Sequence, residues 1–252
     1  MNDIDNALKN RILELAERAY SENRFMFTDF LDMSQLSVFY SVQRDVDYVG
    51  TLVSGGTEGC ERCMVRFGSS VLFGYDEPFP ITLLHITPVQ KKFSDPLTHR
   101  DFLGSVIGLG LERTKLGDII VRDNEGYIFV ASSIGDYIVE NLGKVKHTIV
   151  RVNVCDDIPA EIAPVFKEES VIVSSNRLDA IIARVYKLSR DLAVRFISEG
   201  KVFVSGRQMT ENAKQLKPGD TVSVRGKGKF IFESEGGTTK KDKLYINIKL
   251  YV

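Results

Sequence analysis

Two of the three cysteines are close enough in the sequence to share a chemical role. Cys60 and Cys63 are separated by two residues, which is the spacing of half a zinc site. A complete site needs four ligands, and neither Cys155 nor any of the three histidines stands at a spacing that would supply the others. A redox pair would need a thioredoxin setting, with a strand before it and a helix after it, and the sequence predicts neither. We therefore expect no metal site and no cofactor.

The tripeptide His99-Arg100-Asp101 is a second candidate site. It resembles both the catalytic loop of protein kinases and the His-Arg-Leu-Asp signature of pseudouridine synthases. The kinase interpretation fails because no glycine-rich loop or Asp-Phe-Gly accompanies the tripeptide, and the synthase interpretation lacks the leucine. We predict instead that Thr98 to Asp101 forms the capped start of a helix. Catalysis by Asp101 stays open as the alternative.

Basic side chains form the third and largest candidate site. The 252 residues include 33 Lys and Arg against 34 Asp and Glu, and the net charge of -1 taken alone argues against a polyanion partner. The charge is uneven, because residues 175–230 carry twelve basic and five acidic side chains, a net +7, which leaves -8 on the remainder. This asymmetry is typical of a polyanion-binding module attached to an acidic body. A solvated basic face without a partner stays open as the alternative.

Composition excludes several classes of protein. No apolar run approaches the 18 residues that a membrane span needs. The N-terminal residues Met1 to Asp5 are acidic and polar, unlike a secretory signal. Three cysteines cannot form a disulfide framework. We expect a cytoplasmic monomer with no membrane partner.

The spacing of apolar residues predicts an α+β chain. Residues 3–22 have apolar side chains at helical intervals, and residues 29–42 predict one or two further helices. The middle of the chain alternates strand and helix in the order β-α-β-β-α-β, which is the ferredoxin-like arrangement of many RNA-recognition domains. The predicted domains are a small helical N-terminal domain (1–78), a ferredoxin-like, RRM-like middle domain (79–156), a linker (157–174), and a C-terminal domain with a final strand (175–252).

One strand of the middle domain partly matches the aromatic strand with which RRM domains stack on bases. Tyr127 and Phe129 share one face of that strand. The match is incomplete, because Ile128 replaces the usual small residue and no basic residue precedes Gly126. We predict that both rings are buried in the core or against a helix.

The basic segment predicts a pair of short helices followed by a hairpin. The first helix spans 177–186, and Ser189 is suited to cap a second helix that begins near Arg190 and ends at Gly200. In the following strand we expect Val202 and Val204 to face inward and Phe203 outward. The helix N-terminus at Arg190 offers amides and a guanidinium together, which suits a phosphate. For Arg195, pairing with Asp191 stays open as the alternative.

These residues resemble those of an S4-type RNA-binding domain over roughly a fifth to a quarter of the chain. The sequence departs from the family at Ser205, where an Asn or Asp usually precedes the glycine, and this changes a turn rather than an RNA-facing position. The matching residues are Arg177-Leu178-Asp179, Ser189-Arg190, Ala193, Ile197, Gly200, Val202, Val204, Gly206, Pro218-Gly219-Asp220 and Val224-Arg225-Gly226.

Two further motifs resemble the YlmH family of bacterial proteins. Residues 97–104 read Leu-Thr-His-Arg-Asp-Phe-Leu-Gly, and residues 109–119 read Leu-Gly-Leu-Glu-Arg-Thr-Lys-Leu-Gly-Asp-Ile. With the S4-like domain after them, the resemblance spans essentially the full chain. It implies a non-enzymatic factor that binds the large ribosomal subunit carrying a stalled peptidyl-tRNA, in ribosome-associated quality control. The implied partner is rRNA of the large subunit. Direct contact with peptidyl-tRNA, or with a factor that tails the nascent chain, stays open.

The alternative functions are an rRNA- or tRNA-modifying enzyme, such as a relative of the pseudouridine synthases, and a ribosome-assembly factor. Those synthases carry the S4 domain before the catalytic domain, the reverse of the order here. The only candidate carboxylates for an enzyme are Asp101 and Asp118, and finding them as caps of helices or turns would remove them.

The predicted RNA-binding surface lies in the C-terminal domain, and a loop of the middle domain supplies a second contact. The expected contacts are Arg177, Arg184, Lys187, Ser189, Arg190, Arg195, Lys201, Arg207, Arg225, Lys227 and Lys229, with Arg113 and Lys115 as the second contact.

Overall fold

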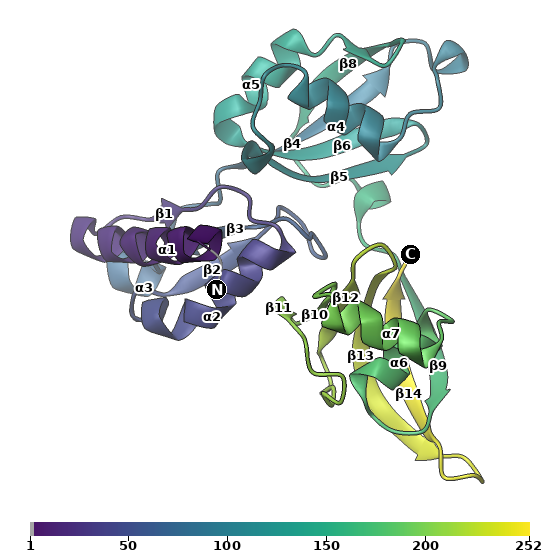
Figure 1. Cartoon of the computed structure of the whole chain (residues 1–252). Helices are drawn as coiled ribbons and strands as arrows, with labels where there is room; N and C mark the ends of the chain where they lie inside the picture. Colours follow the sequence, from purple (N-terminus) through teal and green to yellow (C-terminus); the bar gives the residue numbers. More distant parts are fainter. Residues whose placement is uncertain (1–2) are drawn as a thin grey trace. The chain divides into compact units, whose positions relative to one another are not determined.

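A computed structural model describes residues 3–252, which fold into two compact units that meet at Ala163 and Pro164 in the sequence (Figure 1). The predicted N-terminal and middle domains both fall within the first unit. No helix among residues 3–252 is long and apolar enough to cross a membrane.

The N-terminal part of the first unit combines helices with a small sheet. The long first helix has Asp3 and Asp5 in its opening turn, where carboxylates favour the helix dipole, and it buries Ile12 and Leu15. Asp32 begins the next helix with a capping box, its carboxylate accepting from two main-chain amides. The elements are α1 (Asp3–Glu22), β1 (Met26–Phe27), α2 (Met33–Val46), η1 (Asp47–Val49), β2 (Thr51–Ser54), β3 (Met64–Phe67) and α3 (Ser70–Phe73).

The predicted helical N-terminal domain has its helices and also contains a small sheet that the sequence did not predict. The strands β1, β3 and β2 form an antiparallel sheet in that order, and Phe67 at its centre is fully buried. None of these strands exceeds four residues. Strands this short give too few alternations for a period of two to stand out in the sequence.

The middle of the first unit contains the predicted order β-α-β-β-α-β, with one additional two-residue strand, β7, before the last strand. Its antiparallel sheet runs β5-β6-β4-β8-β7, and α4 and α5 cover one face, where Phe102, Val106 and Ile138 are buried. The elements are β4 (Ile81–Pro88), η2 (Lys91–Phe93), α4 (His99–Ile107), η3 (Arg113–Lys115), β5 (Leu116–Arg122), β6 (Glu125–Ala131), α5 (Ser132–Asn141), β7 (Lys144–Val145), β8 (Thr148–Cys155) and η4 (Ala160–Ile162).

The second face of this sheet is also covered. Tyr127 and Phe129 retain only 2% and 1% exposure, as expected for core residues. They pack in one cluster with Phe30 and Met64 from the N-terminal part and with Ile162 from η4. The rings that an RRM would offer to bases are therefore closed off by the same unit.

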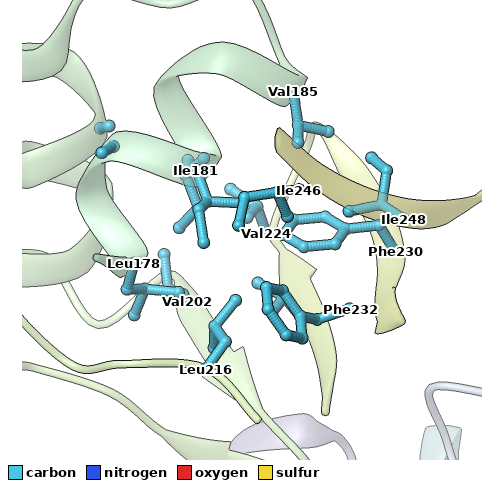
Figure 2. Packing of buried hydrophobic residues seen from close by; sticks show 14 of the residues in the cluster. Leu178, Ile181, Val185, Val202, Leu216, Val224, Phe230, Phe232, Ile246 and Ile248 are labelled. Carbon is cyan, nitrogen blue, oxygen red and sulfur yellow. The ribbon is translucent and has the colours of Figure 1, made fainter. Parts of the chain in front are cut away.

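The second unit places two helices against a six-stranded antiparallel sheet of order β11-β10-β12-β13-β14-β9. Figure 2 shows Leu178, Ile181 and Val185 of α6 packed against Phe230 and Phe232 of β13. The elements are β9 (Phe166–Val173), α6 (Leu178–Val185), α7 (Arg190–Ser198), β10 (Val202–Val204), β11 (Arg207–Gln208), β12 (Thr221–Val224), β13 (Gly228–Thr238) and β14 (Leu244–Tyr251).

Two expectations for this unit are wrong. Half of the predicted linker, 157–174, is the strand β9, which pairs with β14 over eight residues. The prolines that suggested a linker precede the strand, and its alternation is clear only at its end, where Val171 and Val173 enter the core. Phe203 is 1% exposed rather than outward-facing, because all three residues of β10 are buried.

The packing in Figure 2 predicts a large cost for truncating Phe232, which is fully buried. Phe232→Ala should lower the free energy of unfolding by about 3–5 kcal/mol, since it removes apolar burial and leaves a cavity. Phe93→Ala is the matched control, because that ring is 79% exposed and its removal should change stability by less than about 0.5 kcal/mol. Urea unfolding followed by circular dichroism measures both, and equal losses would contradict the core assignment.

Candidate nucleic-acid interface

A buried carboxylate organises the basic residues of the second unit. Asp179 is 2% exposed and accepts hydrogen bonds from the guanidinium groups of Arg177 and Arg190. The Arg177 Nε and Nη2 atoms lie 3.1 and 3.0 Å from its oxygens, and those of Arg190 lie 3.1 and 3.2 Å away. The main-chain amide of Ala180 donates to the same carboxylate at 2.9 Å. Arg177 occupies the N-cap position of α6 and Arg190 begins α7, so the Asp179 side chain joins the starts of two helices.

The charge balance at Asp179 favours its ionised form. Burial raises the pKa of this carboxyl, but the hydrogen bonds and charges of Arg177 and Arg190 outweigh burial, so the pKa lies below its usual value. One negative and two positive charges leave the cluster positive. The two guanidinium groups remain 41% and 48% exposed, so their outer donors are accessible to an anion.

A hollow of about 470 Å³ opens beside this cluster. Arg184, Lys187 and Arg190 line it, together with apolar side chains such as Ile172 and Leu188. Arg184 belongs to the last turn of α6 and Arg190 to the first turn of α7. Between them the backbone of Lys187 adopts a left-handed φ of 53°, which turns the chain from one helix to the next. Three predicted contacts therefore converge on one concave surface.

Ser189 caps α7 as predicted. Its hydroxyl accepts from the main-chain amide of Leu192 at 3.2 Å, and its backbone is extended. This cap fixes the direction of the first turn of α7, and hence of Arg190, at the edge of the hollow.

Three of the remaining predicted contacts, Arg195, Lys201 and Lys227, form a second basic group around Phe196 and Glu199, at the other end of α7. Arg195 and Lys201 both pair with Glu199, at 3.5 and 2.7 Å, so Arg195 pairs one turn later and not with Asp191. The ammonium groups of Lys201 and Lys227 lie 5.6 and 5.9 Å from the ring centre of Phe196.

The other three predicted contacts lie on or directly after strands of the sheet. The guanidinium of Arg225 lies 5.4 Å from the ring centre of Phe203, and the ammonium of Lys229 lies 5.1 Å from that of Tyr251. Arg207 begins β11 and is exposed. The nine residues of α7 separate the hollow from Glu199 by about 13 Å, at 1.5 Å per residue. The predicted surface is thus divided, with the hollow at the start of α7 and the second basic group at its end.

The expected second contact in the middle domain has partners within the protein. The Lys115 ammonium pairs with Asp29 at 2.7 Å, and the Arg113 guanidinium donates to the carbonyls of Leu116 and Gly117 at 2.6 and 3.2 Å. Burial, helped by the nearby charge of Arg62, lowers the pKa of Arg113 to about 10. These two side chains bind the protein itself.

Arg62, which sequence reasoning missed, explains why residues 109–119 form a motif. Its guanidinium donates to the carbonyls of Leu116, Phe30 and Arg113 at 2.8, 3.1 and 3.1 Å. The main-chain amides of Glu61 and Arg62 donate in turn to Asp118 at 2.6 and 3.0 Å. The motif therefore joins the N-terminal part of the first unit to the sheet of the middle part.

Both carboxylates of the enzyme alternative have structural partners. Asp101 accepts from the Thr98 amide and hydroxyl at 2.8 and 2.7 Å, which confirms the predicted helix start. Asp118 holds the junction just described. Across residues 3–252, no three acidic, cysteine or histidine side chains gather in a way that could hold a metal ion.

The Asp179 cluster predicts a pH dependence of stability. The pKa of Asp179 is lower in the folded protein than in the unfolded chain. The stabilisation by its two arginine partners is therefore complete above the unfolded pKa near 4, and it is lost as the pH falls through the folded pKa. Asp179→Asn should cost about 1–3 kcal/mol at pH 7, since two guanidiniums lose a charged acceptor. Its deficit relative to the parent should shrink below about pH 4. Urea unfolding at pH 7 and pH 3 measures this, and a deficit that is equal at both pH values would contradict it.

The junction predicts a second stability effect. Arg62→Met keeps an apolar stem but removes one donor from each of three carbonyls, of which that of Leu116 keeps Arg113 and that of Arg113 keeps the Leu116 amide; the loss should cost about 1–3 kcal/mol. Arg24→Met is the control, because Arg24 is exposed and pairs with Glu22 at the surface, where a pair contributes less than about 1 kcal/mol. Thermal unfolding compares the two, and the junction would be refuted if the control lost as much stability.

Comparisons with known proteins agree with this division of the chain. Residues 75–157 match the family described as "Putative RNA-binding domain in YlmH", and residues 176–222 match the S4 domain. The chain is 28% identical over 243 residues to the ribosome-associated protein quality control protein P2 of Bacillus subtilis, covering 95% of this chain and 92% of that protein.

Shorter similarities relate part of the chain to ribosomal proteins. The chain is 32% identical over 66 residues to the small ribosomal subunit protein uS4 of Thermosipho africanus and over 85 residues to that of Hyphomonas neptunium. These matches cover 26% and 32% of this chain and 32% and 42% of those proteins. Among solved structures, the cell division protein ylmH from Streptococcus pneumoniae matches with a TM-score of 0.49 at 21% identity, over 62% of this chain and 93% of that one. The chain belongs to the YlmH family and carries an S4 domain in its second unit.

Proposed function

We propose that this protein is a non-enzymatic RNA-binding factor of ribosome-associated quality control that binds rRNA of the large ribosomal subunit. Similarity over almost its whole length to a ribosome-associated quality control protein supports the process. The S4 domain and its basic hollow support the ligand. The observation that carries the proposal is the convergence of Arg184, Lys187 and Arg190 on one concave surface beside the Asp179 cluster.

The chemistry of the hollow suits phosphates of a folded RNA rather than base edges. Guanidinium groups held by Asp179 are already oriented, so little side-chain freedom is lost when a phosphate binds. Phosphate contacts fix position and orientation without reading sequence. The second basic group, around Glu199 and Phe196, supplies further cations along the same unit.

The two units carry net charges of opposite sign. Residues 164–252 carry 17 basic and 10 acidic side chains, a net +7, and the remaining residues carry -8. An acidic body is repelled by rRNA, so the second unit approaches first. We include in the proposal that the first unit faces peptidyl-tRNA and a nascent-chain tailing factor. Arg113 and Lys115 serve within that unit to hold the fold.

Neutralising one cation of the hollow provides the test. For about five phosphates engaged, the logarithm of affinity for purified large subunits should fall with the logarithm of salt at a slope of roughly -3.5 to -4.5. Arg184→Gln or Lys187→Gln should each make this slope less steep by about 0.7–0.9, and should weaken binding about five- to eightfold at 0.1 M salt.

Lys167→Gln provides the matched control. It makes the same change of charge on β9, at an exposed residue paired with Glu169, outside the set of predicted contacts. It should leave both slope and affinity nearly unchanged. Co-sedimentation across a salt series measures all four proteins, and a flat salt dependence of the parent would refute the proposed function.

A further inference from the structure

The strands β13 and β14 continue beyond the core of the second unit into a basic turn. Figure 1 shows the two yellow strands running out past α6 to their connecting turn. That turn, residues 239–243, contains Lys240, Lys241 and Lys243, all exposed. None of the three forms an ion pair with any group among residues 3–252. They belong neither to the hollow nor to the second basic group.

The turn has a defined backbone. The Thr239 amide donates to the Lys243 carbonyl at 2.8 Å, and the Asp242 amide donates to the Thr239 carbonyl at 3.0 Å. The Thr239 hydroxyl accepts from the amides of Lys241 and Lys243 at 3.3 and 3.1 Å, and Asp242 takes a left-handed φ of 53°. These bonds fix where the three lysine stems begin.

The turn carries its positive charge next to two acidic residues of β13. Glu233 pairs with the ammonium of Lys249. Glu235 accepts from the side-chain amide of Asn176. That amide is neutral, so Glu235 keeps its charge, four residues before the turn. The turn itself has three lysines against Asp242, a net charge of +2.

Asn176 also fixes the hairpin relative to the arginine pair. Besides Glu235, its side chain bonds the carbonyl and the amide of Leu216, at 2.9 and 3.1 Å. The next residue in the chain is Arg177, which occupies the N-cap position of α6 and donates to Asp179. Leu244, the residue after the turn, pairs with Val173 of β9, and Val173 lines the hollow. The turn and the hollow therefore lie at the same end of this ladder.

We infer that Lys240, Lys241 and Lys243 form a second phosphate-binding point for the RNA whose backbone occupies the hollow. The inference rests on the proposed function. Because the turn and the hollow lie at the same end of the β9–β14 ladder, the hairpin lengthens the stretch of RNA backbone that this unit can contact. A lysine ammonium is a compact point charge on a flexible stem, which suits contacts with backbone phosphates. It is poorly suited to reading bases.

The test compares two triple variants of the full chain with equal charge. In the first, Lys240, Lys241 and Lys243 become Gln; in the second, Lys92, Lys144 and Lys167 become Gln, all three being exposed residues elsewhere. If two of the turn lysines contact phosphates, the first variant should bind purified large subunits about 25- to 60-fold more weakly at 0.1 M salt. Its salt slope should be less steep by about 1.4–1.8, and the difference should vanish towards 1 M salt. The second variant should bind like the parent.

Equal affinity and slope for the two triple variants would overturn the inference, as would a loss of affinity that is independent of salt. Failure of this inference can be distinguished from failure of the proposed function, because Arg184→Gln tests the hollow alone. If Arg184→Gln weakens binding and the turn variant does not, only the hairpin inference fails. Both triple variants should keep the parent's unfolding midpoint, since all six side chains are exposed.

Discussion

The second unit depends on one buried negative charge. A carboxylate with 2% exposure is tolerated only when it is paired and fully hydrogen-bonded, and Asp179 reaches that state through two guanidiniums and one amide. Because the donors come from the starts of α6 and α7, the same pairing sets the angle between the helices and the opening of the hollow. Stability and the proposed RNA site thus share one interaction, with the arginines serving both.

In the first unit, arginine side chains also make hydrogen bonds within the protein, but they bind main-chain carbonyls instead of a buried carboxylate. The guanidinium groups of Arg62 and Arg113 donate to main-chain carbonyls. The sheet face that RRM domains offer to bases is covered by Phe30 and Ile162. A ferredoxin-like element order therefore says little about ligand binding here. The basic residues of this unit must be judged by their partners, since an arginine held by three carbonyls has few donors left for a phosphate.

Local signals in the sequence predicted local structure well. Helical periodicity gives α1, α6 and α7, and the side chains of Thr98 and Ser189 cap helices where the sequence places them. The predictions that failed concern features whose partners lie far away in the sequence. The strand β9 is defined by β14, seventy residues later, and the roles of Arg62 and Asp179 depend on atoms that the chain brings together only after folding. Residue type identified the cations of the site, but it could not say which cations are already paired.

The position of β9 also determines where this protein can be divided. The match to the S4 domain begins at residue 176, but the folded unit begins at Pro164, because β9 forms the outer strand of the sheet. A fragment cut at the family boundary would leave eight residues of β14 without their ladder partner. An uncovered strand of this kind pairs readily with other chains. The smallest fragment that keeps β14 paired with β9 therefore starts a dozen residues before the recognisable domain. Truncations made at the sequence motif would report on self-association rather than on RNA.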